Sequence, residues 1–364
     1  YKTNGESAVT NDGAKIVAEL LVKHPAAKAF VSLADSQENA CGDGVTGCII
    51  LASELMSEAG RLLERGIHPL ILVKGYEMAL SEVIELVDLR STKVSDRLEK
   101  VSRTALVGRS TEGAMEHLAS LISEAVTSIP DSDYERVRMV KSGEGAPESS
   151  KLIRGIIIQK GLALERMPRK LNQSKLLVLS CPIELENTKV ASEIEISTPE
   201  QYEAFIDAEE KQIESIINKV KNSGANAVFS AEVIDQRALH SFADSGIFAL
   251  GGLEKSIAED IANACGAKLC DHVDDSTESL GQILELTHHR RDGVEGIEER
   301  IIIDVGQGSG IVTISVGGTD GIATEEIIRG LYDSLRSTCL AKEDDSILLG
   351  GGSFHMAASL KIRE

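Results

Sequence analysis

The sequence lacks several features that would define other classes of protein. Its six cysteines form no C-x-x-C pair, so we expect neither a disulfide framework nor a thiolate zinc site, and a reducing cytoplasm fits best. No apolar run approaches the length of a bilayer span, and the N-terminal residues lack the basic and apolar regions of a signal peptide. The sequence therefore predicts a cytoplasmic protein that is neither exported nor inserted in a membrane.

Positive charge is also scarce. Lys and Arg total 38 against 58 for Asp and Glu, which gives a formal net charge of -20. That excess would repel a phosphate backbone or an anionic membrane surface, so we expect no nucleic acid and no membrane partner. The 364 residues are 42% hydrophobic and 26% charged, as in folded globular proteins, and the length predicts roughly two or three domains.

The first part of the chain is expected to be almost wholly helical. Apolar residues recur there at helical spacing between turn signals. The expected helices cover residues 14–36 with a break at Pro25, then 47–66, 70–89, 95–106 and 112–128. Residues 142–150, which are poor in apolar side chains and rich in Gly, Ser and Pro, are expected to form a linker near a domain boundary.

The second part has the pattern of a small α/β unit, in which short β-type runs alternate with helices. Its best-marked helix begins at Pro199 after the N-cap residue Thr198 and runs to Val220. The β-type runs are residues 155–159, 176–181, 227–229, 247–250, 268–270, 301–305 and 311–316, and a last helix is expected over 324–340. His288 and His289 are expected to be an exposed loop pair rather than a metal site, because no Cys or carboxylate stands at ligand spacing.

One glycine-rich turn could carry chemistry. The sequence Gly42-Asp43-Gly44-Val45-Thr46-Gly47 matches G-x-G-x-x-G formally, but a dinucleotide fold needs a strand before the motif, and the preceding residues are polar and helical. Backbone N-H groups at a helix start and the Thr46 hydroxyl suit phosphate oxygens, while Asp43 would repel phosphate unless a divalent cation lay between them. The turn favours a magnesium nucleotide, with an ordinary helix-capping turn as the alternative. No Walker A sequence is present, which excludes a P-loop enzyme.

Other candidate residues have simple structural explanations by themselves. Asn11-Asp12-Gly13 is a turn signal. Asp333 stands one helical turn from basic residues and could be a solvated ion-pair partner. Residues 350–352, three glycines, could form a mobile loop or a place where backbone approaches a ligand.

Taken together and in order, these segments resemble the group II chaperonins, the family of the archaeal thermosome and the eukaryotic cytosolic chaperonin ring. The resemblance runs along nearly the whole chain. The residues that carry it are Thr10-Asn11-Asp12-Gly13-Ala14, His24-Pro25-Ala26-Ala27-Lys28, Gly42-Asp43-Gly44-Val45-Thr46, Ile67-His68-Pro69 with Gly75-Tyr76, Thr104-Ala105-Leu106 with Gly108, Gly317-Gly318-Thr319, Leu331-Tyr332-Asp333-Ser334-Leu335 and Gly350-Gly351-Gly352.

The resemblance implies a multi-domain fold of α and α/β type. It divides the chain into a helical equatorial ATPase domain, a small intermediate hinge domain and an α/β apical domain with a helical protrusion near residues 190–222 that forms a built-in lid. The implied boundaries are 1–98 for the partial equatorial domain, 99–154 and 300–348 for the two parts of the intermediate domain, 155–299 for the apical domain, and 349–364 for the start of the second equatorial part.

The same resemblance implies a site for ATP and Mg²⁺. Asp43 would hold magnesium, Gly44, Val45 and Thr46 would contact the phosphates, and Gly351 would lie against the nucleotide. Asp12 and Asp333 would be the catalytic pair that positions the attacking water, which suits phosphoryl transfer because that reaction depends on placing water in line and neutralising charge.

The implied function is that of an ATP-dependent molecular chaperone subunit. It would encapsulate and fold unfolded polypeptides in a double ring of homologous subunits, coupling ATP hydrolysis to lid closure. Family segments expected before Tyr1 and after Glu364 are not in the sequence, so we expect weak or no hydrolysis and no stable ring from these 364 residues.

Two alternatives remain open at this point. One is a degenerate paralogue or fragment whose apical region binds unfolded chains without ATP. Val45 and Gly47 favour it, because the family has hydroxyl residues at both positions, whereas retention of Asp12, Asp43 and Asp333 argues against it. The other is an unrelated magnesium-nucleotide transferase, which would explain the glycine-rich turn but not the later motifs.

Overall fold

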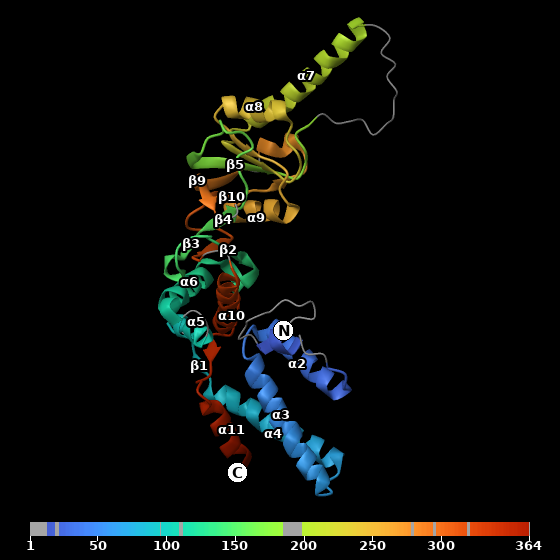
Figure 1. The fold of residues 1–364 in the computed structure, drawn as a ribbon, viewed down its shortest axis with the longest axis vertical. Helices are drawn as coiled ribbons and strands as arrows, with labels where there is room; N and C mark the ends of the chain where they lie inside the picture. Colours follow the sequence, from blue (N-terminus) through green and yellow to red (C-terminus); the bar gives the residue numbers. More distant parts are fainter. Residues whose placement is uncertain are drawn as a thin grey trace.

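The computed structural model describes residues 13–18, 22–94, 96–108, 112–184, 199–277, 280–293, 296–318 and 321–363. The chain is drawn out along one axis, with three parts stacked from bottom to top in Figure 1. We call them the lower part (residues 13–93 and 346–363), the middle part (98–153 and 312–344) and the upper part (155–304). The lower and middle parts each combine an early and a late segment of the sequence, whereas the upper part is one continuous segment.

The lower part is built from helices. They are α1 (Gly13–Ala18), α2 (Pro25–Cys41), α3 (Val45–Glu64), α4 (Pro69–Arg90) and α11 (Ser353–Arg363). The short strands β1 (Thr92–Lys93) and β12 (Ser346–Ile347) pair antiparallel above α4 and α11 in Figure 1. A His-Pro pair starts both α2 and α4. The Nδ1 atoms of His24 and His68 accept hydrogen bonds from the N-H groups two residues on, at 3.2 and 3.3 Å, and proline follows at the first helical position.

Few side chains are buried in the lower part. Its small core joins Ala34 of α2 and Val45 of α3, with Val17 and Ile49 packed against them. Many apolar side chains of α3, α4 and α11 lie instead on the surface, as in Leu70 of α4, which is 72% exposed.

The middle part packs three helices against a small sheet. The helices are α5 (Leu98–Leu106), α6 (Met115–Ser128) and α10 (Ile322–Asp344). Short 3₁₀ turns, including η3 (Tyr134–Arg136), connect α6 to the first strand of the sheet in the sequence. The strands β2 (Val137–Lys141), β11 (Val312–Val316) and β3 (Lys151–Ile153) are ordered β2-β11-β3, with β11 parallel to β2 and antiparallel to β3. Residues more than 170 positions apart, such as Val137 and Val312, therefore share one core.

The upper part is a seven-stranded mixed sheet with helices on both faces. Its strands are β4 (Gly155–Ile158), β5 (Lys170–Leu179), β6 (Ala227–Ser230), β7 (Phe248–Leu250), β8 (Leu269–Cys270), β9 (Gly281–Gly293) and β10 (Gly296–Asp304), in the order β4-β10-β9-β5-β6-β7 with β8 also paired to β5. Side chains alternate along β5, so that Leu176 and Val178 enter one core and Leu177 and Leu179 the other. Helix α9 (Lys255–Cys265) covers the first core, and α7 (Pro199–Asn222) and α8 (Gln236–Asp244) cover the second.

Several sequence expectations are met here, and one is wrong. The strongly marked helix is present as α7, which projects from the top of the molecule in Figure 1, although its expected cap Thr198 lies outside the described residues. His288 and His289 are not in a loop but in β9, where the His288 side chain is only 1% exposed. The second half of β9, which pairs with β10, is rich in charged and histidine side chains. These side chains hide the alternation of apolar and polar residues that would predict a strand. None of the helices in the described ranges is long and apolar enough to cross a membrane.

The packing of α10 predicts a large effect of one buried residue on stability. Leu331 is fully buried in the core of the middle part, so we expect Leu331→Ala to lower the free energy of unfolding by about 2–5 kcal/mol through lost burial and a cavity. Ile322 on the same helix is 62% exposed, and Ile322→Ala should change it by less than about 0.5 kcal/mol. Urea unfolding followed by circular dichroism measures both. Similar losses for the two variants would contradict the packing described.

Candidate functional site

The glycine-rich turn, here called the glycine loop (residues 42–47), joins the end of α2 to the start of α3. Gly42 and Gly44 both have left-handed backbones, with φ of 73° and 82°, which side chains with a Cβ adopt at a cost. The Gly42 N-H closes α2 by donating to the Glu38 carbonyl at 2.9 Å. The two glycines thus turn the chain sharply and leave Asp43 at the apex between the two helices.

The start of α3 has no side-chain cap from its own N-cap residue. Its N-cap is Gly44, which supplies no side-chain hydrogen bond, and its first turn holds no acidic residue. Gly44 and Thr46 are exposed. The first N-H groups of a helix have no partner within the helix and lie at the positive end of its dipole, so this end suits phosphate oxygens.

Asp43 is half-buried, and its backbone is held in place by Gln37, whose Nε2 donates to the Asp43 carbonyl at 3.0 Å. Val45 turns its side chain into the small core of the lower part, where it is 4% exposed. Only the backbone of Val45 can therefore face a ligand. A hydroxyl side chain at this position would have to leave that core to reach a phosphate. Valine at position 45 therefore removes less phosphate-binding capacity than the resemblance to the chaperonins implied.

The start of α1 also meets the glycine loop. A Cβ built on Gly13 would lie 2.4 Å from Thr46 Oγ1, so the backbone at the start of α1 is in direct contact with the Thr46 side chain. Asp12, one of the two expected catalytic carboxylates, lies outside the described residues.

Helix α10 of the middle part passes over this site. Near its start, Glu325 accepts a hydrogen bond from Lys141 at 3.0 Å, and this bond, aided by the charges of Lys141 and of Lys15 in α1, holds the pKa of Glu325 below its usual value. Near its middle, Arg336 lies against Gly42 and donates to the Glu38 carbonyl at 3.1 Å. Asp333 stands between these two points along the helix.

Asp333 itself is 5% exposed. It is therefore not the solvated surface carboxylate that its basic neighbours in the sequence allowed. The next residue, Ser334, is fully buried and pairs with Ser102 of α5 through their hydroxyls at 2.8 Å, which fixes this turn of α10 against α5. Both the burial and the neighbouring contact give the Asp333 side chain a defined position.

In the described part of the chain, no contact like those of Gly13 and Arg336 links Gly351 to the glycine loop. It lies in the turn between β12 and α11, where a Cβ built on it meets nothing within 4 Å. Helix α11 continues along α4, where Lys361 approaches Glu82 at 3.5 Å. The expected nucleotide contact of Gly351 stays a prediction.

The residues present fit magnesium held together with phosphate. Within the described ranges, no three His, Cys, Asp or Glu residues gather closely enough to hold a metal ion by themselves. Mg²⁺ needs no such cage, because it commonly keeps several waters and binds through one or two carboxylates plus substrate phosphates. Asp43 beside the open start of α3 offers that arrangement.

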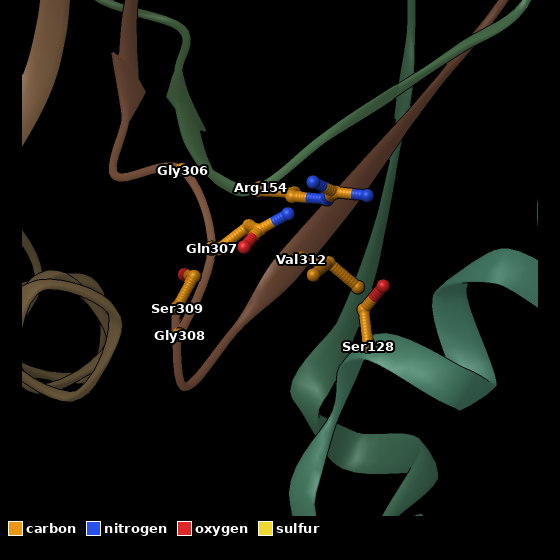
Figure 2. Close-up of a pocket in the computed structure, with 7 residues that line it drawn as sticks. All are labelled: Ser128, Arg154, Gly306, Gln307, Gly308, Ser309 and Val312. Carbon is orange, nitrogen blue, oxygen red and sulfur yellow. The ribbon is translucent and has the colours of Figure 1, made fainter.

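Two cavities of the described part lie elsewhere. Figure 2 shows one of about 230 Å³, where the loop that holds Gln307 and Ser309 faces Val312 and Ser128. It is formed where the two connections between the middle and upper parts run together, and Arg154 on one of them pairs with Glu124 at 3.0 Å. The other, about 1300 Å³, lies between β2, β4 and α9. Neither is lined by the glycine loop, so cavity size does not identify the site, which is an open surface turn.

Arg336 is the site residue that sequence reasoning missed. In the sequence it was only one of two basic residues near Asp333, and nothing local to it signalled a contact with Gly42, nearly 300 positions earlier. The contact needs glycine at position 42, because a Cβ there would lie against Arg336. Of the two residues, only the glycine stood out in the sequence.

Comparisons with known proteins agree with the fold. The model of the TCP-1/cpn60 chaperonin family matches residues 1–364. The chain is 35% identical to a thermosome subunit of Methanocaldococcus jannaschii over 370 residues, which cover 99% of this chain and 68% of that protein. It is 35% identical to the thermosome subunit beta of Methanothermobacter thermautotrophicus over 366 residues, which cover 99% of this chain and 67% of that protein.

A solved structure is similar as well. The open-state monomer of a group II chaperonin from Methanococcoides burtonii matches with a TM-score of 0.60 and 26% identity, over 88% of this chain and 75% of that one. The chain therefore belongs to the TCP-1/cpn60 chaperonin family and has the chaperonin fold. It spans about two thirds of the length of the thermosome relatives.

Substitution by alanine should change the free energy of unfolding differently at Gly42 and at Gly47. A Cβ at Gly42 would strain a left-handed backbone and lie 2.4 Å from the Cβ of Arg336, so Gly42→Ala should lower the free energy of unfolding by about 1–2 kcal/mol or more. Gly47 lies inside α3, where a Cβ meets nothing within 4 Å, and Gly47→Ala should be neutral or stabilising by up to about 1 kcal/mol. Urea unfolding of both variants tests this, and an equal loss for the two would refute the loop geometry.

Proposed function

We propose that this chain is a subunit of an ATP-dependent molecular chaperone that encapsulates and folds unfolded polypeptides, and that the glycine loop is its site for magnesium and ATP. The observation that carries the proposal is the loop geometry. Two left-handed glycines present Asp43 beside an uncapped helix start, and α10 lies directly against this turn. Membership of the chaperonin family supports the same activity.

Each site residue has a role in this proposal. Asp43 holds the magnesium ion, and the backbone N-H groups of Gly44, Val45 and Thr46 bind phosphate oxygens. Asp12 and Asp333 orient the attacking water. Bound magnesium neutralises charge on the phosphates, and the buried position of Asp333 keeps its carboxylate aimed rather than mobile. Gly351 would reach the nucleotide only if the turn before α11 lay closer to α3 in the bound state.

The larger organisation is proposed in the same terms. The lower part with residues 1–12 corresponds to the equatorial ATPase domain, the middle part to the intermediate domain and the upper part to the apical domain. The parts differ from the boundaries given under Sequence analysis at two places, since β10 continues to Asp304 in the upper sheet and β12 (Ser346–Ile347) pairs with β1 of the lower part. Helix α7, which projects beyond the sheet of the upper part, belongs to the helical protrusion that closes as a lid. Unfolded polypeptides would be the substrates, and homologous subunits in a double ring the partners, in the cytoplasm.

One observation favours the second candidate, a module that binds unfolded chains without ATP. The upper part buries two apolar cores of its own, one on each face of its sheet, so its packing does not depend on the nucleotide site. Nucleotide binding by the glycine loop separates the two candidates, because the module requires none.

Magnesium-dependent ATP binding, measured by calorimetry on the whole chain, tests the proposed site. Asp43→Ala should weaken binding by at least about tenfold, since a charge-assisted contact contributes about 1.5–3 kcal/mol. Asp35→Ala removes the same charge from an exposed position on α2 and should leave the affinity unchanged. Asp333→Asn should also preserve affinity, because its proposed role begins after binding, but should slow hydrolysis of bound ATP in a single turnover.

Three outcomes are informative. Loss of affinity in Asp43→Ala alone supports the site. Equal affinity in Asp43→Ala and Asp35→Ala contradicts it, since magnesium would then be held elsewhere. No ATP binding by the unsubstituted chain favours the binding module.

A further inference from the structure

Arg336 brings α10 into contact with the glycine loop. The aliphatic stem of Arg336 lies on Gly42 so closely that a Cβ there would be 2.4 Å from Arg336 Cβ and 2.7 Å from its Cδ. Its Nη1 donates to the Glu38 carbonyl at 3.1 Å. Its guanidinium carbon stands 4.8 Å from the centre of the Tyr134 ring, in η3 of the middle part. One residue thus touches the last turn of α2, the first residue of the glycine loop and an aromatic ring of the middle part.

The electrostatics at the carboxyl end of α2 favour a cation at that end. The last turn of α2 contains no basic residue of its own, although the carboxyl end of a helix is its negative pole and has carbonyls without helical partners. The Glu38 carbonyl accepts from both Gly42 N-H and Arg336 Nη1. A carbonyl oxygen has two lone pairs, so the two bonds are compatible and hold the loop and α10 at one atom.

Asp333 is one helical turn from Arg336 on α10. Residues three apart lie on neighbouring positions of a helix surface, so Arg336 and Asp333 belong to one turn of the same rigid helix. Asp43 and the start of α3, in contrast, stay on the lower part whatever α10 does. The geometry separates the groups that would bind the nucleotide from the group that would orient water, and Arg336 joins the two.

We propose that Arg336 is a positioning residue that locks α10, and with it Asp333, onto the glycine loop, so that an occupied loop is sensed by the middle part. The proposal rests on the proposed function for the meaning of the coupling, but the lock itself is a property of the chain without nucleotide. Arginine suits the task better than lysine because its planar guanidinium can donate to Glu38 and stack on Tyr134 at once.

The lock is tested by amide hydrogen exchange on the full chain without nucleotide. Arg336→Ala should speed exchange of the Gly42 amide and its neighbours by about tenfold or more, because the loop loses its cover from α10. Arg336→Lys should restore part of the protection, and Tyr134→Phe, which keeps the ring, should match the unsubstituted chain. Lys342→Ala is the matched control, since Lys342 also donates from α10 to a backbone carbonyl, that of Val126 at 2.7 Å, but within the middle part.

The coupling is tested by repeating the exchange with magnesium and ATP. In the unsubstituted chain, nucleotide should protect both the glycine loop and the amides of α10 around Asp333. In Arg336→Ala it should still protect the loop but no longer α10, a separation that a general loss of stability would not produce. Lys342→Ala should behave as the unsubstituted chain does.

Failure of this inference is distinct from failure of the proposed function. Equal loop exchange in Arg336→Ala and the unsubstituted chain overturns the lock. Protection of α10 by nucleotide that persists in Arg336→Ala overturns the coupling. If ATP changes exchange nowhere in the unsubstituted chain, the proposed nucleotide site is wrong, and the nucleotide-free comparison still decides whether Arg336 holds the loop.

Discussion

The structure depends on one shared element, helix α10. Its apolar side, including the fully buried Leu331 and Leu335, is fixed in the core of the middle part, where burying each such side chain contributes about 1.5–3 kcal/mol. Its contact with the lower part is small and partly polar, made by Arg336 at the end of α2. The core of the middle part therefore sets the position of Asp333 on α10, while Asp43 lies on the lower part.

This arrangement is possible because the lower and middle parts each combine two segments of the chain, one before and one after the continuous upper part. Strand β11 follows the upper part in the sequence and pairs with β2, which precedes it. The sheet of the middle part therefore combines strands from both sides of the upper part in the sequence. Two connections therefore run side by side between the middle and upper parts, and the cavity of Figure 2 lies where they meet. Any change at α10 has a direct covalent route to the upper sheet through β11 and β10. The fold thus links the proposed nucleotide site to the part of the molecule farthest from it.

Much of this organisation could be predicted from the sequence, but only where the signal is local. The turns at Pro25 and Gly66, the helix beginning at Pro199 and the glycine loop all follow from capping, glycine or proline rules, and the chaperonin resemblance is confirmed by the family match. Strand β9 was missed because half of it is charged, and the exposed position expected for His288 was wrong because its side chain is only 1% exposed within the sheet. The Arg336 contact could not be predicted, since it depends on how two distant segments pack. Glycine at position 42 has a local reason, its positive φ, and a distant one, the arginine lying against it.

The central claim is that α10 and the glycine loop together form one magnesium nucleotide site. A structure of the chain determined with magnesium and a non-hydrolysable ATP analogue tests it most directly. The account predicts the metal beside the Asp43 carboxylate, phosphate oxygens on the N-H groups at the start of α3, and Asp333 facing the terminal phosphate while Arg336 remains on the Glu38 carbonyl. A nucleotide bound away from residues 42–47, or bound there with α10 detached and Asp333 turned into the core, would contradict it.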